Sequence, residues 1–224
     1  MRKLLVPAAA LIVSRLATPV IALPQSSTFE TSLDGWTLVD ADGNSAQGTL
    51  FWQATGGNPG GFAFYRDFGS DGGFISAPSA YLGDWSELNG TGELRYEHRI
   101  VFMNNVTAIV PYEVRIAGTG GQARYLGGIS PGPGSWVQVT VPINEIDWTV
   151  TTGTWAGILS GVTNLRIRIE QVDGNDHDGI DNVWLGQSST SIPVITSAGG
   201  VVLVILLMFL GALRIRRGVV KHSV

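Results

Sequence analysis

Apolar and polar residues alternate along several stretches of this chain. In residues 94–100 one side of the alternation is formed by Leu94, Tyr96, His98 and Ile100. The same pattern recurs in residues 112–116, 136–141 and 165–170. Because successive side chains of an extended strand point to opposite faces, a period of two predicts β-strands with one buried face.

Short apolar runs between turn-forming residues supply further strands. They occupy residues 50–52, 62–65, 74–76 and 183–185, and glycine-rich clusters such as residues 56–61 separate them. Helical spacing is confined to residues 154–164. Eight or more short strands joined by such turns predict an all-β fold, an antiparallel β-sandwich of the jelly-roll type.

The N-terminus has the composition of an export signal. Arg2 and Lys3 precede an apolar run at residues 4–13, and small or apolar residues at 20–22 offer a cleavage site. Residues 1–22 are therefore predicted to be a secretory signal peptide. Because Arg15 and Pro7 are atypical of such a segment, an uncleaved anchor is the alternative.

The C-terminal region predicts a membrane span. No charged residue occurs at positions 182–213, and residues 192–213 are long enough as a helix to cross a hydrocarbon core of ~30 Å. Basic residues follow at once in the tail, residues 214–224, which the positive-inside rule places in the cytoplasm. Residues 23–187 then form one exported domain at the cell surface, and residues 188–191 form a linker.

Charge is unevenly distributed along the chain. Residues 23–187 contain all 18 acidic residues, seven arginines and no lysine. Such an acidic domain repels phosphate backbones, so nucleic-acid binding is excluded. Because the chain has no cysteine, disulfides, thiolate metal sites and thiol nucleophiles are excluded too.

Several separated motifs resemble one extracellular domain family. Residues 74–84, 92–96, 146–148, 154–155, 162–168 and 180–183 resemble, in order, the laminin B type domain, also called laminin domain IV. The resemblance runs from about Phe29 to Gly186. It implies a non-catalytic extracellular β-sandwich, similar to galactose-binding-like and carbohydrate-binding jelly rolls. Laminins carry cysteine-rich repeats around this domain, and this chain has none, so laminin-type matrix assembly does not transfer.

The C-terminal segment loosely resembles the PEP-CTERM class of sorting signals. It has Ile192-Pro193, a small polar stretch, an apolar segment and then Arg214 to Arg217, but the usual Pro-Glu-Pro is absent. The resemblance implies an envelope sorting protease as a partner. A plain single-span anchor is the alternative.

Acidic residues suggest calcium binding at three places. Residues 173–182 contain four aspartates, which suits a hard cation but equally suits a solvated turn before the last strand. Residues 40–44 allow the same two interpretations. The resemblance to carbohydrate-binding jelly rolls implies a structural Ca²⁺ held by Glu30 and Asp181.

Enzymatic chemistry finds little support. Glu145-Ile146-Asp147 is similar to the strand of jelly-roll glucanases, but Val150 stands where the second carboxylate should be. His98 is interpreted as an ordinary strand residue. The chain is therefore predicted not to be an enzyme, and a divergent hydrolase is the least favoured alternative.

Five of the seven arginines fall, by strand parity, on the polar side of three strands. They are Arg95, Arg99, Arg115, Arg166 and Arg168. Arginines beside carboxylates can bind sugar hydroxyls or uronic acids, which predicts a glycan-binding surface. The alternative is a solvated ladder of salt bridges. We expect an exported, membrane-anchored or sorted surface protein that binds a glycan; a purely structural or adhesive envelope protein is the alternative.

Overall fold

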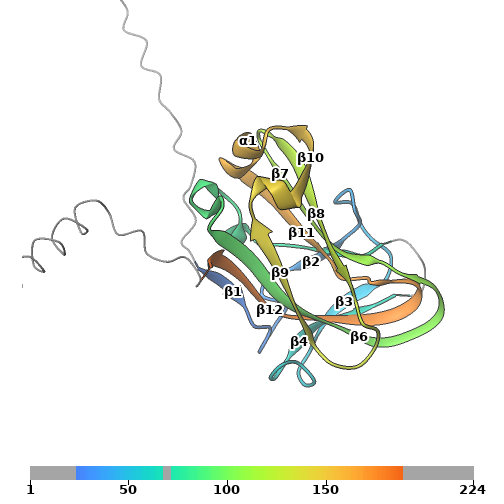
Figure 1. Cartoon of the computed structure of the whole chain (residues 1–224). Coiled ribbons are helices and arrows are strands. Elements are labelled where there is room, and N and C mark those ends of the chain that lie inside the picture. The colour runs from blue at the N-terminus through green and yellow to red at the C-terminus, as the bar shows by residue number, and fades with distance from the viewer. Residues whose placement is uncertain (1–23, 68–71, 189–224) are drawn as a thin grey trace, which may run out of the picture. The chain divides into compact units, whose positions relative to one another are not determined.

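The computed structural model describes residues 24–67 and 72–188 (Figure 1). The predicted signal peptide, membrane helix and basic tail lie outside these residues, as does the predicted linker apart from Ser188, so all four remain predictions. Within the described part of the chain, no helix combines the length and the apolar composition that crossing a bilayer requires.

The described residues form two antiparallel sheets, as Figure 1 shows. The first sheet contains, in spatial order, β3 (Thr49–Gln53), β4 (Phe62–Arg66), β12 (Val172–Gln187), β6 (Gly92–Ile109) and β9 (Val137–Ile143), with β1 (Gln25–Ser27) also paired to β12. The second sheet contains β10 (Trp148–Gly153), β8 (Gly121–Ile129), β7 (Pro111–Gly118), β11 (Val162–Arg168), β5 (Phe74–Ser76) and β2 (Thr37–Val39).

The core lies between the two sheets. Leu94 and Tyr96 contribute to it from β6, and Leu165 and Ile167 contribute from β11. The intervening residues of both strands are only partly buried, so alternation correctly predicted which side of each strand is buried. The predicted antiparallel β-sandwich is therefore confirmed.

Helical structure is limited to short segments. The helix α1 (Trp155–Leu159) begins after Thr154, whose hydroxyl accepts a hydrogen bond from the Gly157 amide. Three single turns of 3-10 helix, η1 (Ser79–Tyr81), η2 (Ser86–Leu88) and η3 (Glu145–Asp147), complete the described elements. The helical spacing of residues 154–164 thus predicted a helix in the right place, but Val162 already belongs to β11.

The acidic segment at residues 173–182 is a strand, so its interpretation as a turn was wrong. It forms most of β12 and pairs with β6 over its length. Register shifts between Asp173 and Asn175 and between His177 and Asp178 accommodate the irregular sequence as β-bulges. Asp176, Asp178 and Asp181 are all buried. Pairing with β6 outweighs the turn preference of these residues.

Candidate functional site

The five arginines predicted to share one face belong to different sheets. Arg95 and Arg99 lie on β6 in the first sheet, whereas Arg115, Arg166 and Arg168 lie on β7 and β11 in the second. The outer faces of the two sheets of a sandwich point in opposite directions. The expectation of one common arginine face was therefore wrong, because strand parity does not reveal which sheet a strand joins.

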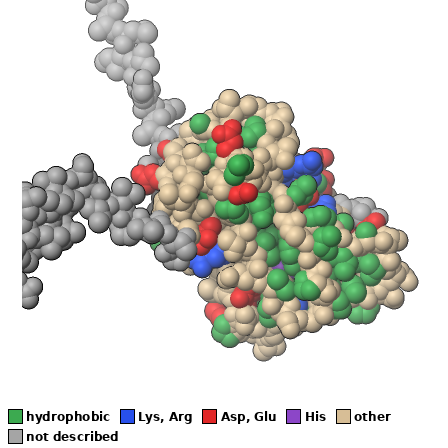
Figure 2. Space-filling view, in the orientation of Figure 1, with side chains coloured by type: hydrophobic (Ala, Val, Ile, Leu, Met, Phe, Trp, Pro, Cys, Tyr) green, Lys and Arg blue, Asp and Glu red, His purple; other side chains and the backbone are tan. Residues whose placement is uncertain are grey.

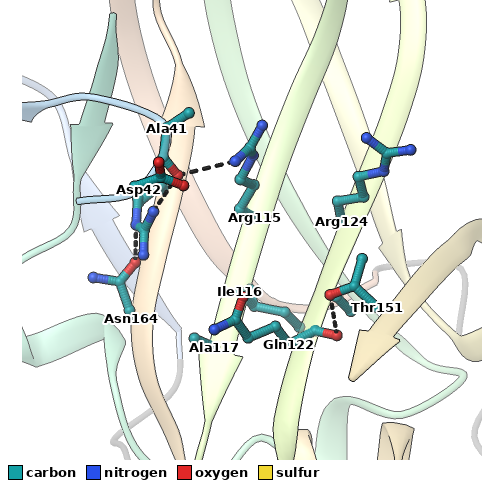
Figure 3. Close-up of a pocket in the computed structure, with 11 residues that line it drawn as sticks. Ala41, Asp42, Arg115, Ile116, Ala117, Gln122, Arg124, Thr151 and Asn164 are labelled. Carbon is teal, nitrogen blue, oxygen red and sulfur yellow. Dashed lines mark hydrogen bonds between the residues drawn. The ribbon is translucent and has the colours of Figure 1, made fainter. Parts of the chain in front are cut away.

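Three arginines of the second sheet form a row across neighbouring strands. In the strand register Arg166 of β11 lies opposite Arg115 of β7, and Arg115 lies opposite Arg124 of β8. Figure 3 shows Arg115 and Arg124 projecting side by side. Arg124 is not among the arginines that the sequence predicts for this surface, although the buried Ala123 beside the exposed Arg124 is a short alternation signal.

The arginine row lines a cavity of about 240 Å³, which we call the arginine pocket. Its polar lining is Asp42, Arg115, Gln122, Arg124, Thr151, Asn164 and Arg166 (Figure 3). The second sheet provides all of these except Asp42, which comes from the loop after β2, and Asn164 and Arg166 extend from the same strand. Three guanidinium groups and the neutral polar side chains of Gln122, Thr151 and Asn164 therefore line the arginine pocket.

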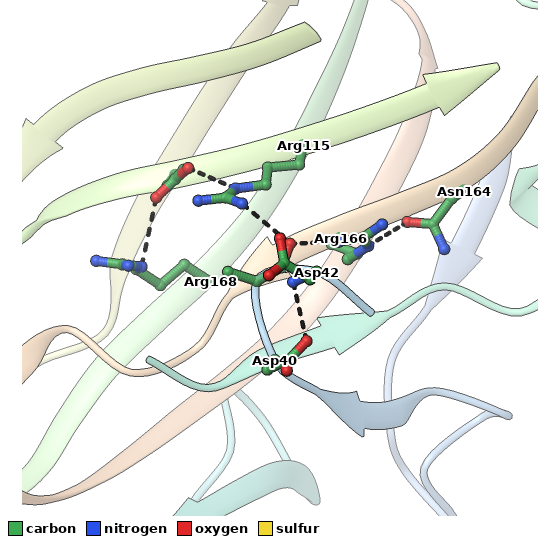
Figure 4. A network of polar contacts seen from close by, with 8 residues as sticks. Asp40, Asp42, Arg115, Asn164, Arg166 and Arg168 are labelled. Atoms are coloured by element: carbon green, nitrogen blue, oxygen red, sulfur yellow. Dashed lines mark hydrogen bonds and ion pairs between the residues drawn. The ribbon is translucent and has the colours of Figure 1, made fainter. Parts of the chain in front are cut away.

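The loop at residues 40–44 covers one end of the row. The carbonyl oxygen of Ala41 accepts hydrogen bonds from Nη1 of Arg115 at 3.0 Å and from Nη1 of Arg166 (Figure 4). Asp40 shapes the loop, because its Oδ1 accepts from the amides of Asp42 at 2.9 Å and Asn44 at 2.7 Å. These hydrogen bonds, led by that from Asn44, lower the pKa of Asp40. Residues 40–44 form a turn that holds Arg115 and Arg166 through the Ala41 carbonyl. Calcium binding by this loop remains a prediction.

The arginines of the second sheet differ in how fully they are paired. Nε of Arg115 donates to Oε1 of Glu113 at 2.6 Å, and Nε of Arg168 lies 3.6 Å from Oε2 of the same residue (Figure 4). Burial, followed by the positive charge of Arg115, lowers the pKa of Arg166. Within the described residues, the Arg124 side chain makes no hydrogen bond or ion pair. Arg124 is therefore the arginine most available to a ligand.

The two arginines of the first sheet stack on aromatic rings. The guanidinium carbon of Arg99 lies 5.0 Å from the ring centre of Trp136, and that of Arg95 lies 4.1 Å from the ring centre of Trp184. Arg95 also forms an ion pair with Glu93 at 3.0 Å. Phe51 and Phe102 of the same sheet are exposed by 39% and 43%, and ring contacts through Phe64 and His177 connect them. This aromatic surface, absent from the sequence prediction, could stack on sugar rings.

The carboxylates predicted to hold Ca²⁺ lie beside one glycine-rich loop. A Cβ atom on Gly60 would collide with the carboxylate of Glu30, and one on Gly57 would come within 2.7 Å of Oδ2 of Asp181. Asp181 already accepts hydrogen bonds from the amides of Asn58 at 2.7 Å and Asn182 at 2.8 Å. Burial raises the pKa of Asp181 to about 6. Calcium binding by Glu30 and Asp181 remains a prediction.

The carboxylates that suggested a hydrolase are not arranged as a strand. Glu145 and Asp147 form the turn η3, in which Asn144 accepts from the Asp147 amide at 3.1 Å and donates to its carboxylate at 2.7 Å. Asp147 is therefore used to stabilise the turn.

Comparison with known proteins supports the fold. No protein-family model and no curated protein matches the sequence. Among solved structures, the L4b domain of human laminin alpha-2 is similar with a TM-score of 0.56 and 14% identity, covering 74% of this chain and 98% of that domain. The expected resemblance to the laminin B type domain is thereby confirmed at the level of the fold.

Two other solved structures are similar at lower TM-scores. The K1 adhesin domain of Lys-gingipain from Porphyromonas gingivalis W83 has a TM-score of 0.47 and 17% identity, covering 75% of this chain and all of that one. The C-terminal family 22 carbohydrate binding module of Clostridium thermocellum Xyn10B has a TM-score of 0.47 and 15% identity, covering 75% of this chain and 94% of that one.

Proposed function

We propose that this chain is an exported surface protein, membrane-anchored or sorted, whose β-sandwich binds an extracellular glycan without catalysing a reaction. The ligand is an anionic glycan, and the arginine pocket holds one of its carboxylate or sulfate groups. The observation that carries this proposal is the row of Arg166, Arg115 and Arg124 across three adjacent strands. Like charges on adjacent strands repel one another, and a bound anion would relieve that repulsion.

The chemistry of the pocket favours an oxyanion on a sugar. Arginine presents a planar fork of donors that matches a carboxylate or sulfate, and Arg124 has no competing partner among the described residues. Gln122, Thr151 and Asn164 add groups that can hydrogen-bond to hydroxyls. The volume of about 240 Å³ is below the ~300 Å³ at which typical small-molecule sites begin, so the pocket suits one unit of a longer chain.

Binding to anionic and neutral glycans tests the proposal. Oligogalacturonate and a hyaluronan oligosaccharide should bind the protein, neutral xylo-oligosaccharides should bind more weakly, and added salt should weaken the anionic complexes, because the screening length is ~8 Å at 0.15 M. Arg124→Gln should reduce affinity by about 10–100-fold, since a hydrogen bond to a charged group contributes ~1.5–3 kcal/mol.

Arg95→Gln is the matched control. It removes the same charge from the opposite sheet, so it should leave affinity for an anionic glycan unchanged apart from a small general effect of net charge. Equal losses in the Arg124 and Arg95 variants would contradict binding at the arginine pocket. If no glycan of either kind binds, the structural or adhesive alternative is favoured.

A second candidate surface is the aromatic surface of the first sheet. Its support is the stack of Arg99 on Trp136 together with the exposed Phe51 and Phe102. Aromatic rings bind sugars through their apolar faces and do not need a charge on the ligand. Preference for neutral glycans, insensitivity to salt and loss of binding in Phe102→Ala would identify this surface as the site.

A further inference from the structure

Three buried carboxylates meet at one end of the sandwich. Asp67 follows β4, Glu170 lies between β11 and β12, and Asp176 lies on β12. Asp67 and Asp176 are fully buried and Glu170 is 4% exposed. One oxygen of each lies within 4.8 Å of the other two. Buried carboxylates are rare unless they are paired or bind a cation.

The hydrogen bonds around this cluster leave Asp176 unsatisfied. Oε2 of Glu170 accepts from the Gly73 amide at 2.5 Å and from the Tyr65 hydroxyl at 3.3 Å. In the described residues, by contrast, neither carboxylate oxygen of Asp176 accepts a hydrogen bond. The side-chain oxygen Oε1 of the buried Gln171 also accepts none. A buried acceptor without a hydrogen-bond donor lowers the stability of the folded protein by about 1–3 kcal/mol.

A buried histidine lies close to the cluster. Nε2 of His98 lies 3.2 Å from Oδ1 of Asp178, which is also buried and lies two residues beyond Asp176. Burial lowers the pKa of His98 to about 4, so the imidazole is neutral at pH 7. A cation bound among the three carboxylates would compensate the cost of burying them.

We propose that Asp67, Glu170 and Asp176 bind one Ca²⁺ ion that fastens β4 and the β11–β12 connection together. Calcium takes six to eight oxygen ligands at 2.3–2.6 Å, so oxygens on opposite sides of the ion lie up to ~5 Å apart. Three carboxylate oxygens that all lie within 4.8 Å of one another are compatible with that span. Magnesium demands near-ideal octahedral geometry, whereas Ca²⁺ tolerates the irregular arrangement expected of carboxylates from separate elements.

A cavity borders Glu170, one of the three carboxylates. A cavity of about 380 Å³ is lined by Glu170, Arg168, Val110 and Val172, among others. An ion can therefore reach Glu170 without unfolding of the sandwich. The cluster is distinct from the predicted pair Glu30 and Asp181, because neither of these belongs to the three-carboxylate group.

Calcium titration of the chelator-treated, purified protein tests this site. Calorimetry should detect Ca²⁺ binding that Asp176→Asn weakens by more than the ~10–100-fold typical of losing an outer-shell partner of a metal. Terbium should also bind, and Tyr65, whose hydroxyl contacts Glu170, should sensitise its luminescence. Asp181→Asn is the matched control, which should retain this sensitised signal.

Two results would overturn the proposal. One is wild-type protein that binds neither Ca²⁺ nor terbium at millimolar concentration, a measurement that needs no variant to fold. The other is a folded Asp176→Asn variant whose Ca²⁺ affinity and terbium luminescence equal those of the wild type. Loss of the signal in Tyr65→Phe with retained Ca²⁺ binding would support the position of the ion.

Discussion

Replacing Arg124 with glutamine should stabilise the protein in the absence of a ligand. Arg124 lies opposite Arg115 in the strand register, and within the described residues its side chain has no ion pair or hydrogen bond. Two unit charges about 5 Å apart in water repel by about 0.8 kcal/mol, and like charges on opposite cross-strand positions destabilise a sheet by about 0.2–1 kcal/mol. Asp42 lines the same pocket and offsets part of this repulsion.

We therefore expect Arg124→Gln to raise the free energy of unfolding by about 0.2–0.8 kcal/mol, which corresponds to ~1–3 °C in the unfolding temperature of a domain of this size. Urea unfolding followed by tryptophan fluorescence measures this change. The gain should shrink at high salt, because salt screens exposed charges.

Arg95→Gln provides the contrast. It removes an ion pair with Glu93 and a contact over Trp184, so it should lower stability by about 0.5–1 kcal/mol. If Arg124→Gln destabilises the protein as much as Arg95→Gln does, Arg124 has a structural role and the inference of a pocket kept charged for a ligand fails.

Three further predictions concern the interior and the calcium sites. Tyr81→Phe should cost about 1–2 kcal/mol of unfolding free energy, because the buried hydroxyl bonds to Ser27 at 3.0 Å and to the Val183 carbonyl at 3.2 Å; an unchanged urea midpoint would refute this. Burial lowers the pKa of His98 from 6.5 to about 4, so the unfolded state protonates first and His98 should make stability fall as pH drops from 6.5 to 4. Buried carboxylates with raised pKa values should make stability rise as pH falls, so the test is the difference between the stability profiles of wild type and His98→Gln. Parallel profiles would contradict the prediction for His98. In an Asp176→Asn background, Ca²⁺ should still raise the unfolding temperature through Glu30 and Asp181, and adding Asp181→Asn should abolish that rise; a rise that survives would exclude this pair.

The sequence predicted the local features of the fold better than the non-local ones. Strict alternation at residues 94–100 correctly predicted which side chains of β6 are buried. Side chains alternate between the two faces because of the geometry of a single strand, whatever its neighbours are. Strand β8 was missed, since Gly127 and Gly128 interrupt its pattern. The arginines were assigned to one face because parity carries no information about which strands pair, and only pairing brings Arg124 beside Arg115.

The acidic segment at residues 173–182 shows the limit of composition. Aspartate and glycine favour turns, yet the segment pairs with β6 and buries Asp176 and Asp178. Burying carboxylates is unfavourable without a compensating group, and those that meet Asp176 come from distant positions, Asp67 and Glu170. The cluster therefore became visible only once the strands were paired.

Side-chain NMR of the arginines tests the central claim most directly. The predicted exported domain contains only seven arginines, so the Nε–H signals of labelled protein can be assigned and followed during titration with an oligogalacturonate. We predict that the signals of Arg115, Arg124 and Arg166 shift together and saturate, while those of Arg95 and Arg99 on the opposite sheet stay in place. Shifts confined to Arg95 and Arg99, or no saturable shift of any arginine, would contradict glycan binding at the arginine pocket.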